Sequence, residues 1–84
     1  MFKASVRVTL RQSVHDPQGN AVKRSLHALG FDGVKDVRVG KLLELEVDVP
    51  NRAQAEEQVV AMCEKLLANP VIETYTVSVE EADA

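Results

Sequence analysis

The stretch FKASVRVTLR, residues 2–11, alternates between apolar and polar side chains. A period of two is typical of a β-strand that buries one face and exposes the other. The apolar side holds Phe2, Ala4, Val6, Val8 and Leu10, and the polar side holds Lys3, Ser5, Arg7, Thr9 and Arg11. We therefore expect residues 2–11 to form a half-buried strand, and the rest of the chain to build around it.

A helix is predicted after this strand. Asp16 can cap it with its carboxylate, and Pro17 suits its first turn. Three apolar residues recur at helical spacing, namely Val22, Leu26 and Leu29. Gly30 can then take the left-handed conformation that ends many helices. The pattern predicts a helix over residues 17–29.

Two β-rich runs come next, residues 34–39 and 42–49, and Gly40-Lys41 separates them. A glycine can adopt the positive φ of a tight turn, so this pattern predicts a hairpin. In the second run Leu43, Leu45, Val47 and Val49 share one face, and Leu42, Glu44, Glu46 and Asp48 share the other. One face of the hairpin should therefore be exposed to solvent.

A second helix is expected after the hairpin. Asn51 is a candidate cap, and Gln54 follows three residues later, as in a capping box. The apolar stripe would consist of Ala55, Val59, Met62, Cys63 and Leu66. The helix should end near Ala68, because the residue before a proline avoids the α region and Pro70 follows Asn69.

Residues 71–79 give a last strand, so the predicted order is strand, helix, strand, strand, helix, strand. This order predicts an α+β fold of the ferredoxin-like, split βαβ type, which is a βαββαβ two-layer sandwich. Both helices would cover one face of a four-stranded antiparallel sheet. We expect a single domain over residues 1–79, followed by an acidic, frayed tail over residues 80–84, which has no apolar partner.

The composition excludes several classes of protein. Ten basic and thirteen acidic residues give a formal charge of −3, the wrong sign for a nucleic-acid-binding protein. The chain has one cysteine, and Arg7 lies where a signal peptide would be apolar, so we expect a cytoplasmic protein. The apolar stretches are far shorter than the ~20 residues that span a bilayer, so no membrane is expected. With 84 residues the core is small, which makes association plausible.

No constellation of residues suggests catalysis or metal binding. Cys63 stands alone in an apolar helix stripe, where cysteine behaves as a small hydrophobe. Neither His15 nor His27 has a cysteine or serine with a second orienting partner nearby in the sequence, and solvent exposure explains both histidines. The open sheet face lacks the aromatic side chains on which RNA bases stack. The sequence therefore predicts no catalytic residue and no metal site.

Two segments are not explained by packing or solvent exposure alone. Gly19 in the first turns of a helix costs ~1 kcal/mol relative to alanine, which suggests that another group approaches that backbone closely. Arg38 and Lys41 flank the predicted hairpin tip, with Glu44 and Glu46 on the returning strand. Cross-strand charge pairing and a docking surface are both open at this point.

Four segments in collinear order resemble the PurS family: VHDPQG at 14–19, LGF at 29–31, VRVGK at 37–41 and ANPVIE at 68–73. The resemblance implies a non-catalytic structural subunit of phosphoribosylformylglycinamidine (FGAM) synthase in purine biosynthesis. Such a subunit bridges a glutaminase, PurQ, which releases ammonia, and an ATP-dependent synthetase, PurL. The resemblance further implies a dimer or tetramer. It also implies that the complex uses ATP, Mg and glutamine, while this chain itself binds no cofactor.

We expect the partner contacts in the two unexplained segments, at Asp16, Pro17, Gln18, Gly19, Arg38, Gly40 and Lys41. The alternative function is a regulatory domain that senses a small metabolite as a dimer, for which glycine-flanked turns could serve. Strong thermal stabilisation by an amino acid or nucleotide alone would favour that alternative. A hydrolase of small acyl phosphates ranks third, because no glycine-rich loop with a catalytic arginine follows the first strand.

Overall fold

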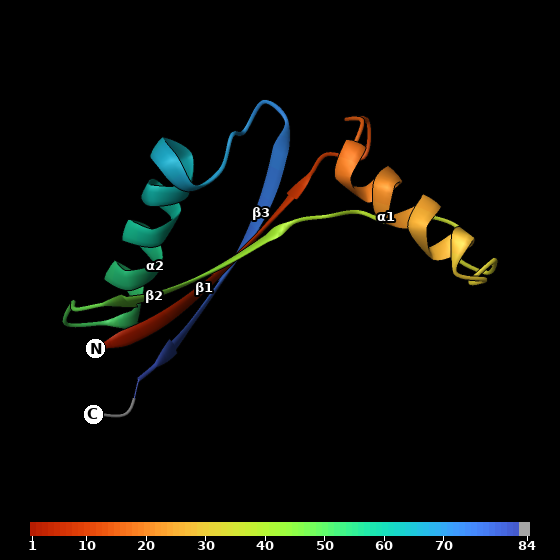
Figure 1. Ribbon diagram of the computed structural model, residues 1–84. Helices are drawn as coiled ribbons and strands as arrows, with labels where there is room; N and C mark the ends of the chain where they lie inside the picture. The colour runs from red at the N-terminus through yellow and green to blue at the C-terminus, as the bar shows by residue number, and fades with distance from the viewer. Residues whose placement is uncertain (83–84) are drawn as a thin grey trace.

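The computed structural model describes residues 1–82, and its three strands form one antiparallel sheet with β1 in the centre (Figure 1). The elements are β1 (Phe2–Leu10), α1 (Pro17–Ala28), β2 (Lys41–Val47), α2 (Arg52–Met62), the π-helical turn η1 (Cys63–Leu67) and β3 (Glu73–Glu81). Along the sheet the order is β2-β1-β3. The strand predicted first is thus the one on which the sheet is built.

The core lies between the sheet and α2. As the alternation predicts, Phe2, Ala4, Val6 and Val8 are buried on one face of β1. Ala55 and Val59 of α2, with Cys63 of η1, pack against that face. The opposite face carries the exposed side chains of Lys3, Arg7, Glu44 and Glu46, as expected.

The prediction of a four-stranded sheet is wrong, because residues 34–40 form no strand and the sheet in the described part of the chain has three. A strand needs a neighbour with which to exchange backbone hydrogen bonds. The pairing of β2 with β1 begins at Lys41, opposite Val8. In this register β1 ends opposite residue 39, so residues 34–38 run past its end and have no strand beside them.

The predicted hairpin at Gly40-Lys41 is wrong as well. Within residues 1–82 the one glycine with a positive φ is Gly30, at 98°, in the position predicted for the end of the first helix. Gly40 has a different reason to be glycine. A Cβ at this position would lie 2.6 Å from the carbonyl oxygen of Val8, so the two backbones approach too closely for a side chain.

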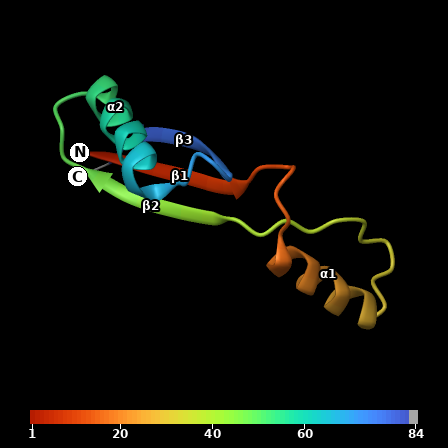
Figure 2. The same ribbon diagram turned by 90° about the horizontal axis from the view of Figure 1, so that it is seen from above.

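The prediction that both helices cover the sheet is also wrong. α1 stands beyond the end of the sheet, in an arm formed by residues 11–40, and α2 alone covers one face (Figures 1 and 2). Gly19 is the buried residue of α1. The radius of gyration is 16.5 Å, whereas a compact chain of this length has one of ~12 Å. The single chain is therefore open and elongated.

The second helix begins as predicted and its helical segment ends near Ala68, also as predicted, but its last turn is π-helical. The Asn51 side chain caps it by accepting a hydrogen bond of 2.9 Å from the Gln54 N–H. In the π turn η1, the Ala68 N–H donates to the carbonyl oxygen of Cys63, five residues back, at 3.0 Å. This wider turn rotates Leu66 outward, where it is 83% exposed, and brings Leu67 against the core instead.

The last strand runs along the whole of β1. Glu73 lies opposite Leu10, and Glu81 lies opposite Phe2. The strand therefore begins and ends two residues later than the predicted residues 71–79. Of the expected tail, residues 83–84 lie outside the described residues. Neither α1 nor α2, nor any other helix within residues 1–82, has the length and apolar character to cross a bilayer.

Candidate partner-binding site at the arm joint

The arm meets the sheet where the chain leaving β1 crosses the chain returning to β2, and we call this crossing the arm joint. Asp16, which is 4% exposed, ties the two segments together. Its Oδ1 accepts a hydrogen bond of 2.9 Å from the Gly19 N–H, and its Oδ2 accepts one of 2.8 Å from the Val39 N–H. One carboxylate thus caps α1, as predicted, and also holds the returning chain.

The electrostatics of Asp16 follow from these contacts. The hydrogen bond from Val39 and then that from Gly19 hold the pKa of the carboxyl below its ordinary value of 3.8. Both bonds favour the charged form, and together they outweigh the desolvation that acts in the opposite direction. Asp16 is therefore a carboxylate at neutral pH.

Arg38 clamps the other side of the arm joint. Its Nη2 donates to the carbonyl oxygen of Arg11 at 2.9 Å and to that of Val14 at 3.0 Å. In the part of the chain that the structure describes, Arg38 therefore bonds to backbone carbonyls rather than to the acidic residues of β2. The clamp fixes the loop that leads from β1 into α1.

Gly19 lies where the returning backbone passes α1. A Cβ at this position would overlap the carbonyl oxygen of Val37. The predicted close approach to Gly19 is thus confirmed, and the approaching group is the chain's own backbone. Asp16, Gly19 and Arg38 together hold the arm at a defined angle to the sheet.

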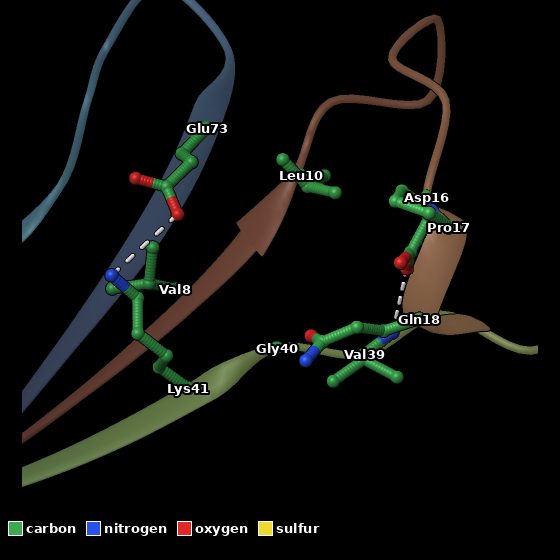
Figure 3. Close-up of a pocket in the computed structure, with 9 residues that line it drawn as sticks. All are labelled: Val8, Leu10, Asp16, Pro17, Gln18, Val39, Gly40, Lys41 and Glu73. Atoms are coloured by element: carbon green, nitrogen blue, oxygen red, sulfur yellow. Dashed lines mark hydrogen bonds and ion pairs between the residues drawn. The ribbon is translucent and has the colours of Figure 1, made fainter. Parts of the chain in front are cut away.

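A cavity of about 290 Å³ opens beside the arm joint, between the start of α1 and the end of the sheet (Figure 3). It is lined by Val8, Leu10, Asp16, Pro17, Gln18, Val39, Gly40, Lys41 and Glu73. Five of the seven predicted contact residues therefore meet around one hollow. The other two, Gly19 and Arg38, lie outside its lining and belong to the joint behind it.

Lys41 and Glu73 form an ion pair at the rim of this cavity, with 3.7 Å between Nζ of Lys41 and Oε2 of Glu73 (Figure 3). Both lie on the face of their strands that is otherwise apolar, at the end where no residue of α2 lines the hollow. Only Lys41 of this pair is well exposed, and a pair so open to solvent on one side contributes ~0–1 kcal/mol to stability. Glu73 is not among the contact residues predicted from the sequence, although a charge on the apolar face of a strand is a signal that can indicate one.

The two histidines and the cysteine, which are the other candidates for catalysis or metal binding, do not lie together at the joint. His27 Nε2 lies 2.8 Å from the carbonyl oxygen of Val34, and His15 Nδ1 lies 3.4 Å from Nδ2 of Asn20. Cys63 is buried in the core, and burial raises the pKa of its thiol. Across residues 1–82 no three potential metal ligands cluster. The arrangement at the joint, an apolar hollow with hydrogen-bonding and charged edges, suits a contact surface.

Comparison with known proteins gives one family. The sequence model described as PurS, phosphoribosylformylglycinamidine (FGAM) synthase, matches residues 3–81. The phosphoribosylformylglycinamidine synthase subunit PurS of Bacillus subtilis is 49% identical over 84 residues, which cover 100% of this chain and 99% of that protein.

Solved structures show the same open fold. The crystal structure of Methanocaldococcus jannaschii PurS, a subunit of formylglycinamide ribonucleotide amidotransferase in the purine biosynthetic pathway, superimposes with a TM-score of 0.89 at 40% identity, over 99% of this chain and 100% of that one. A chain in the structure of PurLQS from Thermotoga maritima gives a TM-score of 0.86 at 40% identity, over 94% of this chain and 96% of that one.

Proposed function

This chain belongs to the PurS family of FGAM synthase subunits, and we propose from this that it bridges a PurQ-like glutaminase and a PurL-like synthetase in the cytoplasm. The observation that carries the proposal is the likeness to a chain in the PurLQS structure, which covers nearly all of both chains. In this role the chain is a non-catalytic subunit that also associates with copies of itself, as a dimer or tetramer.

The chemistry of the proposed complex explains why a bridge is useful. The glutaminase releases ammonia from glutamine, and the synthetase uses ATP with Mg to attach that ammonia to formylglycinamide ribonucleotide. Ammonia that leaves the complex is lost to solvent, so the two active sites need a fixed relative position. A chain whose own arm is held by Asp16 and Arg38 offers surfaces with a fixed geometry for this task. It binds no cofactor itself.

The cavity beside the arm joint is the proposed contact with one of these partners. Asp16, Gly19 and Arg38 are already engaged inside the chain, so the side chains that can face a partner are those at the rim. Gln18 is exposed, and the Lys41 side chain is 58% exposed. We therefore assign recognition of the partner to the side chains at the rim of the cavity. The contacts at the arm joint keep the arm rigid.

The test is assembly of the purified subunits, followed by gel filtration with light scattering in the presence of glutamine and nucleotide. The wild-type chain should bring the glutaminase and synthetase into one complex. The double variant Gln18→Ala/Lys41→Glu should weaken that assembly at least tenfold, with an unchanged circular dichroism spectrum. Arg7→Glu, on the polar sheet face away from the cavity, is the matched control and should assemble normally, because its cross-strand neighbours Leu42 and Thr76 carry no charge.

The outcomes separate the two parts of the proposal. If the wild-type chain joins neither protein, the bridging function is wrong. If the complex forms equally well with the double variant, the bridging function stands and the rim is not the contact surface.

A further inference from the structure

The loop that follows α1 contains the one place in the sequence where glycine comes directly after an aspartate or an asparagine, namely Asp32-Gly33. Both residues are exposed, and they form the centre of a turn that the Val34 N–H closes on the carbonyl oxygen of Phe31. This closing hydrogen bond is long, at 3.4 Å, so it holds the turn weakly. We call residues 31–34 the arm turn. It contributes no residue to the lining of the cavity beside the arm joint.

The nitrogen of Gly33 is free to approach the Asp32 side chain. Within residues 1–82 the Gly33 N–H has no hydrogen-bond acceptor. A Cβ at Gly33 would meet nothing within 4 Å, so the space beside this backbone is open. Glycine also has the widest choice of backbone conformations of all residues. Neither a hydrogen bond nor packing at this position in the described part of the chain therefore holds the nitrogen away from the carboxyl group.

We propose that Asp32-Gly33 is a site at which the chain isomerises spontaneously to isoaspartate. The Gly33 nitrogen attacks Cγ of Asp32, and an N–Cγ bond forms while a bond from Cγ to a carboxyl oxygen breaks. That oxygen leaves as water with the proton of the nitrogen and the proton of the carboxylic acid, which gives a five-membered succinimide. Water then adds back. Cleavage of the N–Cγ bond restores aspartate, whereas cleavage between the nitrogen and the main-chain carbonyl carbon of Asp32 gives isoaspartate.

The other aspartates among residues 1–82 lack this freedom. Asp16 precedes Pro17, whose nitrogen carries no hydrogen and cannot form the same ring. Asp36 and Asp48 each precede a valine, and the branched side chain of valine crowds the neighbouring nitrogen. The Val37 N–H also donates to Oδ1 of Asp36 at 3.0 Å. The reaction should therefore be selective for the arm turn.

Isoaspartate would change the far end of the arm and leave the arm joint as it is. The main chain would then run through Cβ and Cγ of residue 32, which makes it longer by one carbon atom. Two contacts span this residue: the hydrogen bond from Val34 to Phe31, and the contact of 2.8 Å between His27 Nε2 and the carbonyl oxygen of Val34. Both should be displaced. The reaction also leaves a free α-carboxylate at an exposed turn, which is the group that isoaspartyl carboxyl methyltransferases modify with S-adenosylmethionine.

Ageing of the full chain at neutral pH tests the proposal. Samples are taken over several weeks, and isoaspartate is counted by methyl transfer from S-adenosylmethionine with a purified isoaspartyl methyltransferase. Trypsin cleaves after Arg24 and Lys35, and the peptide of residues 25–35 is compared by chromatography with synthetic aspartate and isoaspartate standards. Isoaspartate should accumulate in this peptide, at a rate within fivefold of the rate in the free synthetic peptide. A folded chain that reacts more than fivefold slower than the free peptide would overturn the proposal.

Two variants separate the chemistry of the site from its geometry. Gly33→Ala puts a side chain beside the attacking nitrogen and should slow the reaction at least fivefold, and a Cβ there meets nothing within 4 Å, so the fold should be kept. Asp32→Asn releases ammonia in place of water and should react at least fivefold faster, because an amide is the better substrate for ring closure. An unchanged rate in Gly33→Ala, or no reaction in Asp32→Asn, would contradict the assignment. Since the assay uses this chain alone, its result is independent of the bridging function.

Discussion

Asp16 fixes the position of a whole helix, because its two carboxylate oxygens accept hydrogen bonds from two different segments. Asp16→Asn keeps the shape but has one acceptor oxygen, so one of these bonds is lost. The variant should melt at a lower temperature than the wild type at pH 7.

The same substitution has a predictable pH dependence. The folded pKa of Asp16 lies below the unfolded value of 3.8, so its stabilisation is complete above that value and disappears as pH falls through the folded pKa. The difference in melting temperature between wild type and Asp16→Asn should therefore shrink below about pH 4. Melting curves recorded by circular dichroism from pH 7 to pH 2 measure it. A difference that stays constant with pH would show that the charge of Asp16 is not what holds the joint.

Gly19 is the second residue on which the joint depends. Helix propensity alone favours Gly19→Ala by ~1 kcal/mol. Overlap of the new Cβ with the carbonyl oxygen of Val37 should outweigh this gain, since overpacking costs ~1–3 kcal/mol. Gly33→Ala is the matched control, because a Cβ there meets nothing within 4 Å. Urea unfolding should give a lower free energy of unfolding for Gly19→Ala than for the wild type, and nearly the wild-type value for Gly33→Ala. Equal effects would mean that the crossing is not tight.

At the scale of elements, one hydrogen bond joins β3 to the π turn. The Tyr75 hydroxyl donates to Oε1 of Glu64 at 2.6 Å, and this bond, with burial second, raises the pKa of Tyr75 to about 12. The chain has one tyrosine and no tryptophan, so its ultraviolet absorbance reports this hydroxyl directly. Glu64→Gln should lower the pKa toward 10, the ordinary value. Identical titration curves for the two proteins would argue that the contact does not form in solution.

The elements that sequence reasoning predicted correctly depend on local patterns. The alternation of β1, the Asn51 cap and the Gly30 helix end each follow from a few neighbouring residues. Residues 34–39 have strand character too, but a strand also needs a neighbour, and β1 ends at Leu10. The choice of Leu67 over Leu66 depends on the π turn, which helical periodicity cannot predict when both residues are leucine.

The same distinction applies to the candidate site. Asp16 and Gly19 could be singled out because a cap and a costly glycine are visible within one turn of helix. The crossing with Val37 and Val39 brings together residues about twenty apart in the chain, and the ion pair of Lys41 with Glu73 spans a longer separation. Such contacts depend on how the arm returns to the sheet. They could not be predicted from the sequence, because a hairpin at Gly40-Lys41 would place residues 34–39 beside β2 instead of beside α1.

At the scale of the whole molecule, the open shape follows from the division of the chain into a sheet body and an arm. A chain of 84 residues buries a modest share of its surface even when compact. Here α1 does not pack on the sheet, so apolar surface remains exposed on both the arm and the sheet body. A subunit that works between larger proteins can use such surfaces, whereas an isolated protein would hide them.

The central claim is that this chain lets ammonia from glutamine reach the synthetase, and turnover with two nitrogen sources tests it most directly. FGAM formation is measured with the glutaminase and synthetase subunits, with and without this chain, using glutamine or free ammonia. Omitting the chain should reduce the glutamine-dependent rate at least tenfold and leave the ammonia-dependent rate nearly unchanged. An equal glutamine-dependent rate without the chain would contradict the claim.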